Sequence, residues 1–166
     1  MRRLFFAFIC CALFTACASK PRFKGDGDLC GLIVDENNSP VKDFIVYCEP
    51  ASFNVRVSKP SIPPVITNES GLFVFYGLPS GQYLLSGRKV NYLELGPVTY
   101  RYDDRTKIIC LQTKSFRAAV LSAEELLQLG QTEAAGKVLG GICCEAGSPA
   151  ENFFKEYLAK LEEVSK

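Results

Sequence analysis

The chain of 166 residues contains no histidine. Histidine is the side chain that most often serves as a general base or a metal ligand near neutral pH, so its absence excludes Ser-His and Cys-His catalytic pairs. The G-x-S-x-G motif of hydrolases is also missing, and no close pair of carboxylates lies on a recognisable scaffold. We therefore predict no catalytic residues, no metal site and no cofactor.

The chain also lacks an excess of charge of either sign. It has 19 basic and 18 acidic residues, a formal net charge of +1. Removal of Arg2 and Arg3 with the signal segment described next changes this to −1, from 17 basic and 18 acidic residues. A nucleic-acid partner requires a basic face, so we expect none.

No apolar run is long enough to span a bilayer. The longest, Leu4–Phe14, follows two arginines and has the length of a signal-peptide core. The five residues Leu13-Phe14-Thr15-Ala16-Cys17 resemble a bacterial lipoprotein signal, in which the cysteine is acylated and becomes the new N-terminus. The alternative is an ordinary secretory signal cleaved near Ala16 or Ala18.

The lipoprotein interpretation implies a palmitate-type anchor on Cys17 and a location in the bacterial cell envelope, on the periplasmic or the outer surface. Two or more acyl chains suffice for stable anchoring. The polar stretch that follows, with its Pro and Gly residues, predicts a flexible tether. We accordingly divide the chain into a signal peptide (1–16), a lipidated cysteine with tether (17–27), a β domain (28–115) and a helical segment (116–166).

The β domain alternates short strands with tight turns. Asn68–Gly71 places Asn first and Gly last, as a type I turn favours. Leu72–Tyr76 is short and aromatic, and its period of 2 places Phe73 and Phe75 on one face. Further strands are predicted at Leu29–Asp35, Phe44–Glu49, Gln82–Arg88, Val98–Tyr102 and Lys107–Gln112.

These residues resemble the carboxypeptidase regulatory-like domain, a transthyretin-like (prealbumin-like) β-sandwich. The family pattern runs T-D-x-x-G-x-F-x-L, then L-P-x-G-x-Y-x-L, then a glycine-tyrosine step. The matching residues are Thr67, Asn68, Gly71, Phe73, Phe75, Leu78, Pro79, Gly81, Tyr83, Leu85, Asn91 and Tyr92. Asn38 and Asn91 replace glycines of the family, and Asn tolerates a positive φ. The resemblance covers about 29–113 and implies an antiparallel β-sandwich that is a non-catalytic module.

Two regions of the β domain are candidate ligand-binding surfaces. Tyr100, Arg101, Tyr102 and Arg105 would offer aromatic and cationic groups to a sugar or a peptide, unless the tyrosines simply cover a sandwich edge. The proline-rich segment 51–66 is the longest irregular stretch and a candidate binding loop. The alternative is an insertion without a role.

Five cysteines remain after the signal peptide and Cys17, an odd number for an oxidising compartment. Cys30 and Cys48 lie on consecutive predicted strands and are a possible disulfide. The adjacent Cys143 and Cys144 are a possible vicinal disulfide or ligand pair, although nothing nearby completes a zinc site. Cys48 and Cys110 also suit small buried positions.

From Phe116 the apolar period changes to that of helices. Capping boxes are predicted at Ser122–Glu125 and Ser148–Glu151, and Thr132 is predicted to cap a helix between them. We expect a helical hairpin or three-helix segment, weakly similar to part of a tetratricopeptide-like array. The candidate partner-binding face of the last helix consists of Phe154, Tyr157, Leu158 and Leu161.

The sequence thus predicts a mainly β protein, a transthyretin-like sandwich followed by helices. Its predicted function is that of a non-enzymatic, lipid-anchored envelope protein that binds or positions another envelope macromolecule through the sandwich, the helices or both. Two alternatives stay open. The helices could pack only on their own chain, or the tyrosine-rich strands and proline-rich loop could bind carbohydrate or peptidoglycan.

Overall fold

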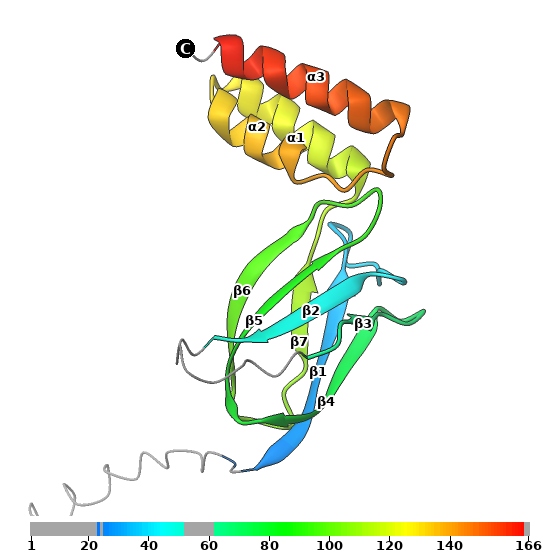
Figure 1. Cartoon of the computed structure of the whole chain (residues 1–166), viewed down its shortest axis with the longest axis vertical. Helices are drawn as coiled ribbons and strands as arrows, with labels where there is room; N and C mark the ends of the chain where they lie inside the picture. Colours follow the sequence, from blue (N-terminus) through cyan, green and yellow to red (C-terminus); the bar gives the residue numbers. More distant parts are fainter. Residues whose placement is uncertain (1–22, 24, 52–61, 165–166) are drawn as a thin grey trace, which may run out of the picture.

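The computed structural model describes residues 23, 25–51 and 62–164, with side chains up to residue 160. The described residues form strands followed by helices (Figure 1). The strands are β1 Asp26–Val34, β2 Ile45–Pro50, β3 Val65–Ile66, β4 Leu72–Pro79, β5 Gly81–Arg88, β6 Leu95–Tyr102 and β7 Ile109–Gln112. The helices are α1 Phe116–Gln128, α2 Thr132–Gly140 and α3 Pro149–Val164.

The strands form two sheets that pack as a β-sandwich. One sheet has the order β4-β1-β7 and the other the order β3-β2-β5-β6. The sandwich is antiparallel as predicted except at one pair, because β7 runs parallel to β1. After β6, the chain crosses from the larger sheet to the smaller one. There β7 lies beside β1 and runs in the same direction.

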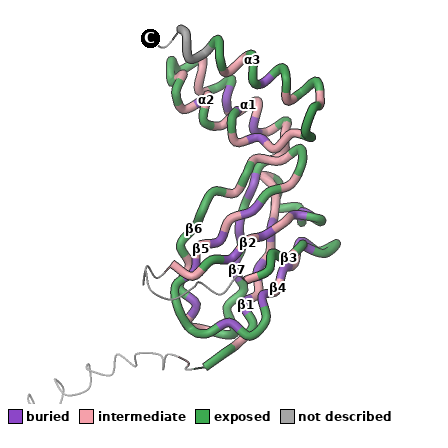
Figure 2. Tube along the Cα trace, viewed as in Figure 1, coloured by how far each residue is buried: buried purple, intermediate pink, exposed green. Residues whose placement is uncertain are grey.

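The core lies between the two sheets and follows the period of 2. Phe73 and Phe75 of β4 are buried, so the shared face predicted for them is confirmed, and Tyr83 and Leu85 of β5 are buried as well. Figure 2 shows buried positions alternating with less buried ones along these strands. The buried Thr67, which follows β3, holds the segment before β2, because its hydroxyl accepts a hydrogen bond from the Phe44 N–H (2.9 Å) and donates one to the Val41 carbonyl (2.6 Å).

The predicted turn residues do lie in turns in the structure. The Gly71 N–H donates to the Asn68 carbonyl at 2.9 Å, which closes the predicted turn. Asn38 and Asn91 have φ of 59° and 66°, so both asparagines take the left-handed conformation expected of them. These two turns confirm that Asn can stand in for Gly here.

Two helix starts differ from the prediction. Ser122 lies inside α1, and the helix is capped by Ser115, whose Oγ accepts from the Ala118 N–H at 3.4 Å. At α2 the cap position is Gln131, and Thr132 is the first helical residue. Ser148 does cap α3, because its Oγ accepts from the Glu151 N–H at 3.2 Å.

The three helices pack at the end of the sandwich opposite the start of β1 (Figure 1). Small buried residues, Ala119, Ala123 and Ala135, line the contact between α1 and α2. The segment after β5 attaches this unit to the sandwich. Leu93 packs into the helical core, and the Glu94 N–H donates to the Gly141 carbonyl at 2.7 Å.

Smaller corrections concern the ends of predicted segments. Asp26 and Gly27, placed in the tether by the sequence, pair with Pro79 and Leu78 as part of β1. The segment 51–66, expected to be irregular, ends in the short strand β3, and its residues 52–61 lie outside the described part. None of the described helices is long and apolar enough to cross a membrane.

Candidate binding surfaces

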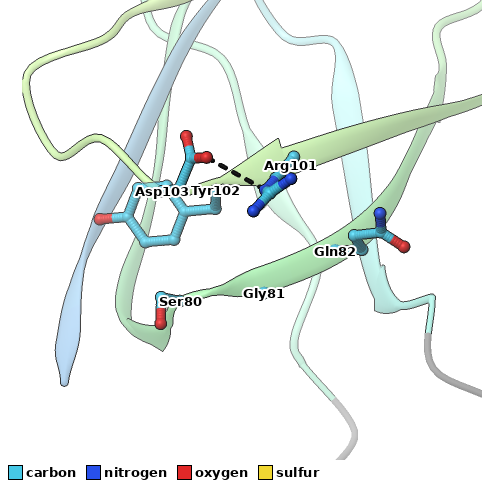
Figure 3. Close-up of a pocket in the computed structure, with 6 residues that line it drawn as sticks. All are labelled: Ser80, Gly81, Gln82, Arg101, Tyr102 and Asp103. Atoms are coloured by element: carbon cyan, nitrogen blue, oxygen red, sulfur yellow. Dashed lines mark ion pairs between the residues drawn. The ribbon is translucent and has the colours of Figure 1, made fainter. Parts of the chain in front are cut away.

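The four predicted ligand-binding residues around β6 do not share one face. Tyr102 points into the core and is only 1% exposed, while Tyr100 is half-buried on the same side. Arg101 points to the opposite, outer face, where it forms an ion pair with Asp103 at 3.0 Å (Figure 3). Alternation along a strand separates neighbouring side chains in this way. Tyr102 is therefore buried in the core, and Tyr100 and Arg101 face opposite sides of β6; ligand binding by the accessible groups stays a prediction.

An open hollow of about 410 Å³ remains beside Arg101. Backbone and polar side chains line it, among them Ser80 and Gln82 of the neighbouring chain segment (Figure 3). Since Arg101 is already paired with Asp103, the hollow offers little unpaired charge to a ligand.

Arg105 contacts residues at and just before the start of β1. Its Nη2 donates to the Asp26 carbonyl at 2.6 Å, and its guanidinium lies 4.4 Å from the centroid of the Phe23 ring. Phe23 in turn meets Tyr102 edge to face, with the ring centroids 5.0 Å apart. Burial raises the pKa of Tyr102, although Arg105 opposes the rise. These contacts hold the chain at its entry into β1.

The predicted partner-binding face of α3 packs largely within the chain. Phe154 is 9% exposed and meets Phe116 of α1 edge to face at 5.6 Å. Tyr157 and Leu158 are half-buried against the same cluster, and the side chain of Leu161 lies outside the described part. The helices therefore do pack on one another. Binding of a partner by the remaining surface of this face stays a prediction.

The cysteines do not form the disulfides considered from the sequence. Cys48 points into the core from β2, whereas Cys30 points outward from β1 in the opposite sheet. Both are free thiols, as are Cys143 and Cys144. Burial, with a smaller contribution from Glu49, raises the pKa of the Cys48 thiol to about 12. Cys17 lies outside the described residues, so its acylation stays a prediction.

Ser86 and Lys89 have the S-x-x-K spacing found in some hydrolases, a pattern that the sequence reasoning missed. The Lys89 amino group does not serve Ser86. It donates to the Lys42 carbonyl at 2.5 Å and lies 5.2 Å from the centroid of the Tyr92 ring. The spacing therefore does not produce a Ser-Lys pair.

A groove that sequence reasoning did not find runs between the outer face of the larger sheet and α2. Its volume is about 730 Å³. Leu84 of β5, Leu95 of β6 and Val138 of α2 supply its apolar wall, and Glu49 and Glu94 stand at its margin. The groove depends on how α2 sits against the sandwich, and no local sequence pattern reports that placement.

The charge of the groove is negative. Glu49 and Glu94 are exposed, and neither forms an ion pair with another described residue. Lys137 also lines the groove, but Glu133 holds its amino group at 2.7 Å. The hydrogen bond from that pair raises the pKa of Lys137 and lowers that of Glu133. An apolar wall beside two carboxylates that no described residue pairs suits a segment that carries an aliphatic and a basic side chain.

No protein-family model matches the chain, and no curated protein matches it. Among solved structures it is similar to a Streptococcal ancillary pilin, with 17% identity over 55% of this chain and 30% of that one, at a TM-score of 0.45. It is also similar to the D312A form of BcpA, the major pilin subunit of Bacillus cereus, with 13% identity over 54% of this chain and 30% of that one, at a TM-score of 0.44.

A third similar structure is (S)-allantoin synthase, with 14% identity over 55% of this chain and 41% of that one, at a TM-score of 0.42. The chain thus spans less than half the length of each of these proteins. They include pilins and an enzyme, so similarity at this level does not decide function. The β-sandwich itself is seen directly in the structure.

Proposed function

We propose that this chain is a lipid-anchored protein of the bacterial cell envelope that has no catalytic role and binds another envelope protein. The groove between the larger sheet and α2 is the observation that carries the binding proposal. Its apolar wall can bury an aliphatic side chain of the partner. Glu49 and Glu94 would meet a basic residue beside it.

We further infer that the sandwich is a transthyretin-like module of the carboxypeptidase regulatory-like type. The turn asparagines with positive φ and the buried Thr67 support this assignment. The anchor is supported by the sequence before Cys17 alone. Loss of detergent-phase partitioning on Cys17→Ser replacement, together with the mass of the N-terminal peptide, tests the anchor separately from the groove.

Photo-cross-linking in cells tests the groove. A photoreactive amino acid placed at position 86, where Ser86 lines the groove, should join the full-length protein to a discrete partner protein. The same group at position 124, on the exposed surface of α1, serves as a control and should not. Equal products from both positions, or none from position 86, would contradict the proposed site.

Carbohydrate binding is the second candidate, and the described residues favour it less. Tyr102 is buried and Arg105 is held by Phe23 and Asp26, which leaves Arg101 and part of Tyr100 accessible. Unchanged polysaccharide binding by a Tyr100→Ala, Arg101→Ala double variant would remove this surface from consideration.

A further inference from the structure

The outer face of the β4-β1-β7 sheet is unusually apolar. In β1 the inward Leu29 and Ile33 alternate with Leu32 and Val34, which point outward. A strand whose two faces are both apolar is typical of a sheet covered on both sides. The outward apolar side chains of this sheet and its margin are Leu32, Val34, Leu72, Val74, Tyr76 and Ile108.

The strand register makes these residues one continuous patch. Leu32 lies between Leu72 of β4 and Cys110 of β7, and Cys30 lies beside Val74. Polar groups occupy only its two ends in the described strands, with Asp28 at one and Gln112 at the other. The Asp28 carboxylate accepts from the Gly77 N–H at 3.2 Å, which draws it toward the strand edge.

The most exposed apolar residues lie at the end of the patch where the chain enters. Tyr76 is 76% exposed and Ile108 is 58% exposed. Tyr76 follows Phe75 in β4, and Phe75 pairs with Leu29, which is the third residue after Asp26 at the start of β1. Tyr76 therefore lies near the start of β1. The contacts of Tyr102 and Arg105 with Phe23 fix the chain at this same end.

The position of the anchor then decides what covers the patch. This step rests on the proposed acylation of Cys17. Phe23 is the sixth residue after Cys17 in the sequence, and the six steps of chain between their Cα atoms reach about 20 Å when fully extended. An anchored chain therefore holds the Tyr76 end of the patch close to the bilayer, with the helices at the far end of the molecule (Figure 1).

The size of the patch argues against a second copy of the chain as its cover. Three strands about 4.8 Å apart over a length of about 20 Å give roughly 300 Å². A stable protein interface needs about 800 Å² from each partner. A tethered surface needs much less intrinsic affinity, because the tether supplies an effective concentration near the millimolar range. We propose that this outer face lies on the lipid bilayer, with Tyr76 and Ile108 at the level of the headgroups.

The chain contains no tryptophan, so a single introduced one reports its own position. Full-length, acylated protein carrying Tyr76→Trp would be placed in phosphatidylethanolamine and phosphatidylglycerol vesicles, with and without brominated acyl chains. Insertion to a depth of about 5–10 Å at the boundary of headgroups and acyl chains should bring the ring within reach of the bromines, so its emission should be lower in brominated than in unbrominated vesicles. Tyr47→Trp, on the outer face of the other sheet, is the matched control and should keep its emission.

Each outcome decides the proposal. Quenching of the Tyr76→Trp protein alone supports it, and equal quenching or none in both proteins overturns it. A blue shift of Trp emission that grows with protein concentration without vesicles would assign the face to a second copy instead. Absence of acyl chains on Cys17 by mass spectrometry overturns the anchor and this inference together. An acylated but unquenched protein overturns only the inference.

Discussion

Two buried tyrosines of the core differ in what their hydroxyl groups contact. The Tyr83 hydroxyl donates to the Pro79 carbonyl at 2.7 Å. The Tyr102 hydroxyl is buried and has no hydrogen-bond partner among the described residues. A buried polar group without a partner costs free energy, whereas a paired one contributes about 0.5–1.5 kcal/mol. The two side chains are therefore a matched pair with opposite expectations.

Tyr102→Phe should leave the free energy of unfolding unchanged or increase it, because only an unpaired hydroxyl is removed. Tyr83→Phe should lower it by about 1 kcal/mol, because the Pro79 carbonyl loses its donor. Urea denaturation of both variants measures the difference. A loss in Tyr102→Phe as large as that in Tyr83→Phe would mean that the Tyr102 hydroxyl has a partner.

At the scale of elements, the joint between sandwich and helices depends on Glu36. Its carboxylate accepts from the Ser115 N–H at 2.9 Å and from the Ser115 Oγ at 2.6 Å, just before α1. Burial pushes the pKa of Glu36 up, but the hydrogen bonds from Ser115 outweigh it, and the net shift is downward. The joint is therefore favoured above the usual carboxyl pKa and weakens as pH falls through the lowered pKa.

Glu36→Gln should speed hydrogen exchange at the Ser115 amide at neutral pH, because a charged acceptor is replaced by a neutral one. In the wild-type protein the protection factor of this amide, which corrects for the slower intrinsic exchange at low pH, should fall when the pH is lowered past the Glu36 pKa. Glu69→Gln removes only an exposed partner of Lys42 and is the control. Identical exchange at Ser115 in all three proteins would show that Glu36 does not hold the joint.

The helical unit gives a second test at this scale. Phe154 is buried against Phe116, whereas its neighbour Phe153 is 61% exposed. Phe154→Ala should destabilise the helices by about 3–5 kcal/mol, and Phe153→Ala should change stability by less than about 0.5 kcal/mol. Thermal unfolding followed by circular dichroism at a helical wavelength compares them. Similar melting curves would mean that the α3 face is not part of the helical core.

Local patterns predicted most of the elements. Period 2 predicted the shared face of Phe73 and Phe75, and the Ser148 capping box predicted the start of α3. The helical period was placed correctly from Phe116, but the cap of α1 at Ser115 was missed, because Ser115 is held by Glu36, which is distant in the sequence. The capping box at Ser122 fits the local sequence pattern equally well. A local pattern cannot include a hydrogen bond to a residue as distant in the sequence as Glu36.

The sites were harder to predict than the elements. Tyr100, Arg101, Tyr102 and Arg105 were predicted as one candidate surface, and the packing of both sheets was needed to show that Tyr102 is buried while Arg101 is exposed. The groove beside Leu84 and Val138 joins elements that are far apart in the sequence. Its existence follows from the pairing of Leu93 with Ile142, which no spacing rule encodes.

At the scale of the whole molecule, the chain is elongated, with the start of β1 at one end and the helices at the other (Figure 1). We propose that the outer face of the β4-β1-β7 sheet rests on the bilayer and that the groove beside α2, on the opposite side of the sandwich, binds a protein. The central claim is that the groove, through Glu49 and Glu94, recognises that partner.

The most direct test is the yield of the position-86 photo-cross-link in full-length protein whose groove charge is reversed. Glu49→Lys with Glu94→Lys should abolish the cross-linked product, because a basic segment would meet two ammonium groups in place of two carboxylates. Glu124→Lys with Glu125→Lys, an equal change of charge on the exposed face of α1, should leave the yield unchanged. Undiminished cross-linking in the groove variant, or equal loss in both variants, would contradict recognition by the groove.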